Sequence, residues 1–531
     1  MSSKVHVLSR RRFLMMAGMT VAGGLAAACA APAAPARPAA TSAPAEATQA
    51  PVATQAPEPT AAATAAAASP AENPKPAGSV ELLYHYPNFS GAPKDQDAVN
   101  EALNTITQAK GGFSIKLNSI DFGGWNDKMQ LINAGGEKYD LAYTANWTND
   151  YYKDVANGVY VALDDLLTSK APKFYSSMPP TTWNAARVKG KIYGAINQQM
   201  FPKVAGLIIR KDIADKYKIP LDAINKLADF EPFLEQVKKG ENMVPFSGDG
   251  LDYPELNGYV PVDDGVAFVW VDPQDKSAKV FNKYANKDFV ANWDLRKRWY
   301  DAGYMPKEAY PDSPTQREAW KAGKHAFSFN PVTKPSGEFE AKAIYGQDVV
   351  LKALAPSVIT TAGITATLTG VSRTGNPDVA TAWLELVNTD KEVYNLLCVG
   401  IEGKHWNWKD KDKLVIEQVK DSAYNPTTDW MFGNQFNAYY RDARQVGSWE
   451  ATKKINDTAT PSPTLGFVFD REPVKTELAS IPAILDQYSA TYPVSQPSSV
   501  LPKLIDELNG VGGSKIIEEM QKQLDAWKKG G

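Results

Sequence analysis

Hydrophobic residues alternate with polar ones in several short stretches that follow residue 78. The stretches SVELLYHY, FSIKLNSIDF and YDLAYT show the two-residue period of β-strands. Between them, residues 99–106 and the stretch WNDKMQLINAGG repeat hydrophobic side chains every three or four positions, which predicts helices. The order strand, helix, strand, helix, strand predicts parallel strands with right-handed helical connections, the beginning of an α/β domain.

This predicted sheet indicates where a ligand would bind, because in such sheets ligands bind beyond the carboxyl ends of the strands. The rule points to His85 and Tyr86 after the first strand, to residues 121–125 after the second, and to Asn146 and Trp147 after the third. We expect these positions to face a common ligand.

Two later stretches have the composition of passages between domains. The first is a short connection that contains Gln198, Gln199 and Pro202, and the second is ALAPSVITTAGITATLTGVS. Between them, GYVPVDDGVAFVWVDPQDKSAKVFNKY predicts antiparallel strands around Asp-Pro turns. The chain ends in a predicted amphipathic helix whose hydrophobic face contains Ile517, Met520, Leu524 and Trp527.

Residues 1–28 have the parts of a secretory signal: a basic start, an apolar run and small residues before Cys29. The start resembles the twin-arginine motif S-R-R-x-F-L. GLAAAC resembles a lipobox, which predicts lipidation of Cys29; a plain secretory signal is the alternative. Residues 29–78, rich in Ala, Pro and Thr, predict a disordered tether, since they cannot bury enough apolar surface to fold.

Composition sets the class of protein. The chain has 531 residues, and the part that remains without the leader and the tether is still too long for one ordinary core. Two or three domains are therefore expected. The net charge of −3 and the mixed signs along the chain give no basic face for nucleic acid. Cys398, the second of two cysteines, has no partner if Cys29 is lipidated, and we expect a buried thiol.

Aromatic residues are the informative bias, with 13 Trp, 23 Tyr and 19 Phe. Aromatic faces stack well on the C–H faces of sugar rings. Several tryptophans stand among polar or turn-forming residues: Trp147, Trp183, Trp270, Trp406, Trp408 and Trp430. Of these, Trp270 in the apolar run VAFVWV is predicted to be core, whereas Trp147 and Trp430 are the candidate plates for a sugar.

From residue 79 onward the chain resembles the family 1 extracellular solute-binding proteins of ABC importers, of the maltodextrin-binding-protein type, and especially their oligosaccharide-type lipoprotein branch. The resemblance is carried by WNDKMQLINAGGEKYDLAYTANW, NGVYVALDDLL, VKGKIYGAINQQ, GLIIRKD and GITATLTGVSRTGNPDVATAWLELV. Near the end it is carried by WMFGNQF, GFVFDREPVKTELA and KIIEEMQKQLDAW. The order of these pieces, joined to a lipobox and a tether, makes the resemblance specific.

The resemblance implies an α/β fold, the type II periplasmic-binding-protein clamp, with two discontinuous lobes joined by a hinge. The expected N-lobe comprises 79–199 and 355–402, and the expected C-lobe 200–354 and 403–531. It also implies a monomer, lipid-anchored on the extracytoplasmic face of the membrane, that captures an oligosaccharide and delivers it to ABC permease subunits. No catalytic residue, cofactor, metal or nucleic acid is expected.

Ten ligand-binding positions follow from the resemblance: His85, Tyr86, Asn146 and Trp147 after strands of the N-lobe, Gln198 and Gln199 in the first hinge, Phe329 and Asn330 at a strand end of the C-lobe, and Trp430 and Asn434 at a late helix start. Maltodextrin binders have a Trp/Asn/Asp/Lys-type set after the first strand, where this chain has His85, Tyr86, Pro87 and Asn88. Maltose is therefore not the expected ligand.

Two alternatives use the same fold. A secreted carbohydrate-active enzyme would need paired carboxylates, but the chain has no G-x-S-x-G, P-loop, H-E-x-x-H or C-x-x-C motif, and its histidines are scattered. A sensory or adhesive lipoprotein would hand its ligand information to a receptor instead of a permease. Neither alternative has a sequence feature of its own.

Overall fold

The computed structural model describes residues 79–530 except 90, 249, 252–253, 309, 311–312, 427 and 490–494. The predicted signal peptide 1–28, the lipidated Cys29 and the tether 29–78 lie outside the described residues. The described residues belong to one compact unit. Among them, no helix combines the length and the apolar character that crossing a membrane requires.

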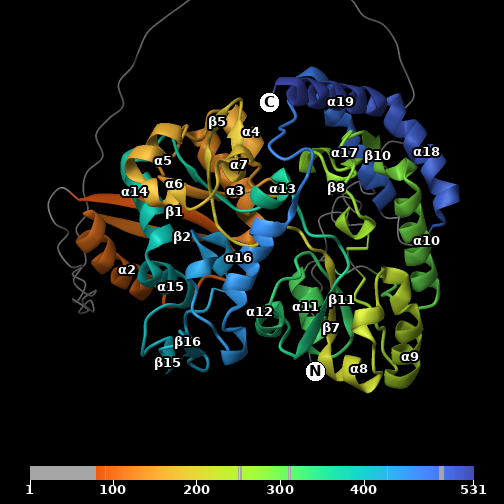
Figure 1. The fold of residues 1–531 in the computed structure, drawn as a ribbon, viewed down its shortest axis with the longest axis horizontal. Coiled ribbons are helices and arrows are strands. Elements are labelled where there is room, and N and C mark those ends of the chain that lie inside the picture. The colour runs from red at the N-terminus through yellow and green to blue at the C-terminus, as the bar shows by residue number, and fades with distance from the viewer. Residues whose placement is uncertain are drawn as a thin grey trace, which may run out of the picture. The chain divides into compact units, whose positions relative to one another are not determined.

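The N-lobe is built on a five-stranded sheet whose order is β2 (Phe113–Asp121), β1 (Val80–Asn88), β3 (Leu141–Thr144), β14 (Leu368–Val371) and β6 (Gly194–Ile196). Strand β1 is parallel to β2 and β3, whereas β14 runs antiparallel to β3 and β6. Helices α2 (Gln96–Gly111) and α3 (Trp125–Gly135) connect the first three strands (Figure 1). The predicted order of strands and helices is confirmed.

The two connecting helices form where the hydrophobic period requires them. Helix α2 buries Val99 and Leu103, which lie one turn apart, and α3 buries Trp125, Met129 and Ile132. Each helix is followed by a glycine in the left-handed region, a conformation that glycine adopts without the steric cost of a side chain. The short helices of this lobe are α4 (Tyr151–Ala156), α5 (Asp164–Lys170), α6 (Pro172–Ser176) and α7 (Pro180–Asn184), with the β4 (Arg187–Val188) and β5 (Lys191–Ile192) hairpin.

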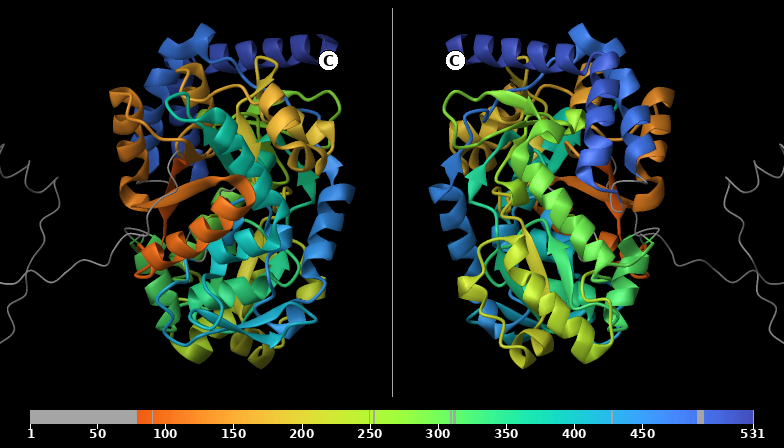
Figure 2. Two further views of the ribbon diagram at one scale, coloured as in Figure 1. Left: turned by 90° about the vertical axis from the view of Figure 1, so that its left-hand side faces the viewer. Right: turned by 90° about the vertical axis from the view of Figure 1, so that its right-hand side faces the viewer.

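Later parts of the chain return to this lobe. They are α13 (Thr361–Ile364), α14 (Pro377–Thr389), α15 (Lys391–Val399), β15 (Trp406–Asp410), β16 (Val415–Gln418) and α16 (Ser448–Thr458). Helix α15 packs beside α2 on the side of the N-lobe that faces the viewer in the left view of Figure 2. Cys398, on α15, is fully buried as expected, and burial raises the pKa of its thiol.

The buried hydrophobic side chains between 406 and 449 belong to the same core cluster as strand β1. Trp406, Val415, Met431 and Trp449 are examples. The predicted division placed everything from 403 onward in the C-lobe and stays a prediction, but these side chains pack into the core that contains β1. A hydrophobic pattern tells which side chains are buried but not which of two cores receives them.

The C-lobe contains two three-stranded antiparallel sheets. One has the order β11 (Phe327–Asn330), β7 (Gly206–Arg210) and β12 (Val349–Ala353), and the other β10 (Val280–Asn282), β9 (Val269–Val271) and β8 (Val260–Pro261). The second sheet confirms the antiparallel strands predicted around the Asp-Pro turns. The helices of this lobe are α8 (Lys211–Lys216), α9 (Glu231–Glu241), α10 (Lys287–Asp301), α11 (Ser313–Lys321), α12 (Gly337–Tyr345), α17 (Lys475–Ser489), α18 (Pro497–Gly510) and α19 (Gly513–Gly530).

The C-terminal helix α19 is amphipathic, as predicted, but its buried face is turned slightly. Ile516, Met520 and Leu524 are buried, with Ile517 beside them. Trp527 was expected on this face, yet it is 37% exposed. A helix repeats every 3.6 residues, so positions 516, 520 and 524 follow one face as well as the predicted set does, and packing against the rest of the lobe decides between them.

Within the described part of the chain, residues 197–205, 354–360 and 459–466 lead from one group of core clusters to the other. The second and third lie side by side, because β13 (Val358–Ile359) pairs in parallel with β17 (Thr460–Pro461). The first is tied to α16 by Asn456, whose Nδ2 donates to the carbonyl of Gln199 at 2.7 Å and whose Oδ1 accepts from the amide of Phe201 at 2.9 Å. The hinge is thus one hydrogen-bonded assembly.

Candidate functional site

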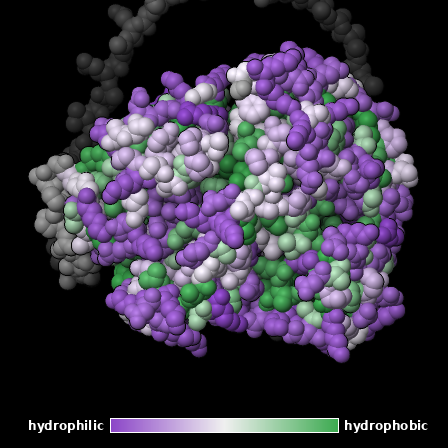
Figure 3. Space-filling view, in the orientation of Figure 1, coloured by the Kyte–Doolittle hydropathy of each residue, from purple (hydrophilic) through white to green (hydrophobic). Residues whose placement is uncertain are grey.

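A cleft of about 1050 Å³ lies between residues of the two lobes. Ligand pockets commonly measure about 300–1000 Å³, so this one has room for a ligand larger than a single small ring. Hydrophobic residues also gather where the lobes meet on the face drawn in Figure 3. The N-lobe contributes Asn126, Gln130, Asn146, Trp147, Asp150, Lys153, Asp154 and Trp430 to the lining, and the C-lobe Glu255, Trp270, Lys283, Lys334 and Glu340 among others.

Four of the ten predicted positions line this cleft: Asn146, Trp147, Gln199 and Trp430. Asn146 and Trp147 follow β3 after one intervening residue, and their side chains donate to the carbonyls of Ala362 and Ala366 at 3.0 and 2.8 Å. Trp147 is nevertheless 45% exposed, and its ring lies 6.5 Å from that of Trp430. That the four contact a ligand stays a prediction.

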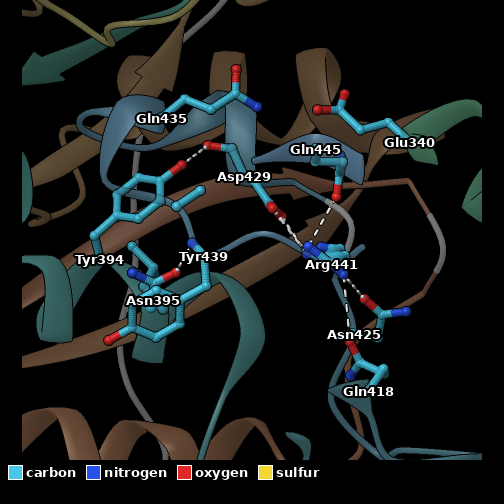
Figure 4. Close-up of polar contacts among 12 residues, drawn as sticks. Glu340, Tyr394, Asn395, Gln418, Asn425, Asp429, Gln435, Tyr439, Arg441 and Gln445 are labelled. Atoms are coloured by element: carbon cyan, nitrogen blue, oxygen red, sulfur yellow. Dashed lines mark hydrogen bonds and ion pairs between the residues drawn. The ribbon is translucent and has the colours of Figure 1, made fainter. Parts of the chain in front are cut away.

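Trp430 is held in place by its neighbour Asp429. Asp429 receives two hydrogen bonds from the guanidinium of Arg441, at 2.9 and 3.0 Å, and its carbonyl accepts from the hydroxyl of Tyr394 at 2.7 Å (Figure 4). Arg441 also donates to Gln418 and Asn425. Burial acts to lower the pKa of Arg441, but the charge and hydrogen bonds of Asp429, together with the weaker effects of Cys398 and Glu340, outweigh it and the pKa is raised.

The two hinge glutamines differ in a way that the sequence does not reveal. Gln199 lines the cleft, and its Nε2 donates to the hydroxyl of Thr367 at 3.0 Å. Gln198 is buried behind it, where its Nε2 donates to Ser177 and Asn388. The backbone amide of Gln198 donates to the carbonyl of Gly433, and its carbonyl accepts from the amide of Gln435, the two neighbours of Asn434. Gln198 is therefore part of the hinge framework.

Six predicted positions are absent from the described lining: His85, Tyr86, Gln198, Phe329, Asn330 and Asn434. His85 is buried in β1, where Asn118 hydrogen-bonds its Nδ1 at 2.8 Å, and burial lowers its pKa to about 4. Tyr86 is also buried and donates to Gln96. The reason is that β1 continues to Asn88, so that these two residues lie within the strand rather than beyond its end.

Phe329 and Asn330 on β11, and Asn434 beside Gln198, also lie outside the described lining of the cleft. The ring of Phe329 lies directly behind Gly250, which does line the cleft, so that a side chain at Gly250 would overlap the ring. The amide of Asn330 donates to Thr333 at 3.1 Å, and Asn434 caps the short helix 435–437 with its Oδ1. These contacts shape the wall and hold its turns.

The sequence patterns did not identify the charged residues that line the cleft. Asp150, Lys153 and Asp154 lie on and before α4, the first helix after Trp147. The rule that ligands bind beyond strand ends would have reached them had it been extended by one helical turn. The prediction that Trp270 belongs to the core is confirmed, and Trp270 also contributes to the cleft lining.

Asp154 is an unusual member of this wall. It is 7% exposed, and it accepts a hydrogen bond from the hydroxyl of Tyr160 at 3.3 Å. Burial raises the pKa of its carboxyl to about 7, and the nearby charge of Asp150 adds to this, whereas Tyr160 and Lys153 act in the opposite direction. The carboxyl therefore changes its charge near neutral pH.

An ion pair joins the lobes at the edge of the cleft. Arg471 binds Asp263 of its own lobe through two hydrogen bonds, of 2.5 and 3.0 Å, and reaches Asp150 of the N-lobe at 3.2 Å. Asp150 also caps α4 by accepting from two backbone amides. The two carboxylates outweigh the effect of burial and raise the pKa of Arg471.

A family model described as a domain of unknown function (DUF3502) matches residues 463–529, which include α17, α18 and α19. A carbohydrate ABC transporter substrate-binding protein of Streptococcus pneumoniae is 26% identical over 452 residues, covering 82% of this chain and 89% of that protein.

Among described residues, no cluster of three or more His, Cys, Asp or Glu could hold a metal ion.

Two solved structures of the N-glycan transport solute binding protein NgtS of Streptococcus pneumoniae share the fold. The complex with Man1GlcNAc has a TM-score of 0.73 and covers 85% of this chain and 100% of that one. The complex with Man5GlcNAc has a TM-score of 0.71 with coverage of 85% and 99%, and both are 23% identical to this chain. The predicted α/β fold of a two-lobed type II clamp is thereby confirmed.

Proposed function

We propose that this chain, a homologue of the substrate-binding proteins of carbohydrate ABC transporters, captures an oligosaccharide in the cleft between its lobes and delivers it to a permease. The observation that carries the proposal is the cleft of about 1050 Å³ with the exposed face of Trp147 and the ring of Trp430 on its N-lobe wall. The relatives are binding proteins, so the proposed role includes no catalytic step.

The chemistry of the wall suits a sugar. Aromatic faces bind the C–H faces of sugar rings, and planar amides such as Asn126, Asn146 and Gln199 both donate to and accept from hydroxyl groups. Acidic and basic side chains are equal in number among the described lining residues, four of each, which favours a neutral ligand with many hydroxyls over a strongly charged one. These features support an oligosaccharide over a phosphate or a nucleic acid.

The proposed site comprises the ten predicted positions in two roles. Asn146, Trp147, Gln199 and Trp430 face the ligand, and the six positions that are buried or half-buried outside the described lining support the wall. The core contacts also support a revised division of lobes, in which 403–458 joins the N-lobe and 467–530 stays in the C-lobe.

A substrate-binding protein of an importer works outside the cytoplasm. We propose that Cys29 carries the lipid anchor and that residues 29–78 hold the clamp away from the lipid. Mass spectrometry of the mature protein tests the anchor, since a diacylglyceryl group on Cys29 adds a defined mass, whereas an unmodified N-terminus would overturn it.

A thermal-shift screen of the purified protein against glycans, peptides and polyols tests the binding function. A ligand at 100 times its Kd stabilises the folded state by about 2.7 kcal/mol. For a lobe of 150–250 residues this raises Tm by about 5–10 °C. We expect such a rise with one class of glycan, and a loss of affinity of about tenfold or more in Trp147→Ala or Trp430→Ala.

Trp527→Ala is the matched control, because Trp527 is also an exposed tryptophan but lies on the C-terminal helix α19. It should bind the same glycan as tightly as the wild type. A shift with peptides or polyols, together with none from any glycan, would reject the oligosaccharide assignment while keeping the importer class.

A further inference from the structure

Four aromatic side chains form a closed cycle of contacts, in which two members line the cleft and two lie outside it. The ring centroids are 4.5 Å apart for Phe89 and Phe122, 5.9 Å for Phe122 and Trp147, 6.5 Å for Trp147 and Trp430, and 5.8 Å for Trp430 and Phe89. Trp147 and Trp430 line the cleft, whereas Phe89 and Phe122 are absent from its described lining. The aromatic surface is thus continuous from the cleft to the protein exterior.

Packing of the core does not account for the positions of Phe122 and Trp147 in this group of four aromatic side chains. Phe122 is 38% exposed and the adjoining Trp147 is 45% exposed, although burial would stabilise both side chains. They are two of five large hydrophobic side chains exposed among the described residues, and these two are in contact with each other. Exposed apolar residues that are contiguous commonly mark a binding surface.

Contacts with neighbouring residues also hold Trp147 and Phe122 in place, as a binding surface requires. The buried Tyr143 contacts both Trp147 and Trp430 edge-on, with centroid distances of 6.5 and 6.2 Å. Phe122 begins a short 3-10 helix that Asp121 caps, since its Oδ1 accepts from the amide of Gly123 at 2.9 Å. A surface fixed before binding loses less conformational entropy when a ligand docks.

We infer that Phe89 and Phe122, together with the outer face of Trp147, form an additional subsite that stacks on a sugar ring of a glycan too long for the cleft. This inference rests on the proposed function, because the ligand is the same glycan that the cleft holds. A sugar is the fitting occupant, since these side chains continue the aromatic lining of the cleft and offer flat faces to the C–H groups of a pyranose. Phe122 then selects for chain length or branching.

Phe122→Leu and Phe122→Tyr separate stacking from simple apolar contact. Leucine keeps an apolar side chain but removes the flat face, whereas tyrosine keeps the face. The probes are short and long members of three series: Man1GlcNAc and Man5GlcNAc, chitobiose and chitohexaose, and maltose and maltoheptaose. Calorimetric titration gives the Kd of each probe for the wild type, both variants and the Trp527→Ala control.

We expect Phe122→Leu to weaken binding of the long probe of one series by about three- to tenfold more than binding of its short probe. Phe122→Tyr and Trp527→Ala should keep the wild-type ratio of the two Kd values. Binding of the short probe also shows that each variant is folded, because it requires the intact cleft.

The remaining outcomes are distinguishable. If the wild type binds none of the six probes, the proposed function fails for these glycans and the outer subsite fails with it. If the wild type binds but Phe122→Leu changes both Kd values equally or neither, the proposed function stands and the outer subsite is refuted. Unchanged binding together with impaired uptake in cells would instead assign the exposed aromatic side chains to contact with another protein, and would also refute the inference.

Discussion

Replacing Asp154 by asparagine should stabilise the protein by an amount that grows with pH. The carboxyl of Asp154 is buried in the cleft wall and its pKa is raised from 3.8 to about 7. Between these two pH values the folded state keeps a proton that the unfolded chain has released. The contribution of Asp154 to the stability of the wild type therefore falls as the pH rises through this window and is constant above it.

The magnitude follows from the difference between the two pKa values. A difference of about 3, at about 1.4 kcal/mol for each pKa unit, gives about 4 kcal/mol. Because the carboxyl borders an open cleft, solvent screening reduces this, and we expect about 2 kcal/mol. Asparagine has nearly the same shape and can still accept the hydrogen bond from Tyr160, but it carries no charge at any pH.

Thermal unfolding of both proteins at pH 4 and pH 8, without glycan, measures the effect. For a lobe of 150–250 residues, 2 kcal/mol corresponds to about 4–8 °C, so the difference in Tm between Asp154→Asn and the wild type should grow by about this amount. Asp165→Asn, in which an exposed carboxylate is replaced, is the control and should show no such growth. A difference in Tm that is the same at both pH values, or that shrinks as the pH rises, would refute the reasoning.

Two further substitutions test the framework of the cleft. Gly206→Ala should lower the free energy of unfolding by more than about 3 kcal/mol, because a methyl group there would overlap the backbone of the neighbouring strand β12. Gly124→Ala is the control: its methyl group meets open space and should change the free energy of unfolding by less than about 0.5 kcal/mol. Urea unfolding measures both, and equal effects would contradict the explanation. Asp150→Asn keeps the helix cap but weakens the ion pair with Arg471 across the lobes, and should lower Tm by about 1–4 °C in low salt and less in 1 M salt. The same decrease at both salt concentrations would show that the charge is not the cause.

The candidate site was predicted in part, and the errors have a physical cause. Asn146 and Trp147 were found because β3 ends just before them, at Thr144. His85 and Tyr86 came from the same rule, but β1 extends to Asn88, since its pairing with β2 continues that far. The residue that actually follows the strand is Phe89, a member of the group of four aromatic side chains.

The charged residues of the cleft could not be predicted as one set, because they come from elements that meet only in the folded chain. Glu340 lies on α12 and Asp154 on α4, and no spacing in the sequence relates them. The same holds for Arg471, which pairs with Asp150 from more than 300 residues away. Such contacts depend on how the lobes are placed, and hydrophobic periodicity carries no information about that.

By itself the sequence determined the order of strands and helices in the N-lobe, the antiparallel strands of the C-lobe, the amphipathic terminal helix and the class of protein. These depend on local periods of 2 and 3.6 residues and on motifs whose order along the chain is preserved. The tertiary structure decided which core received residues 406–449, which of Gln198 and Gln199 faces the cleft, and that Phe89 and Phe122 join Trp147 and Trp430 in one surface. Each of these depends on contacts between distant segments, and the free energy that selects among such contacts comes from packing rather than from local sequence.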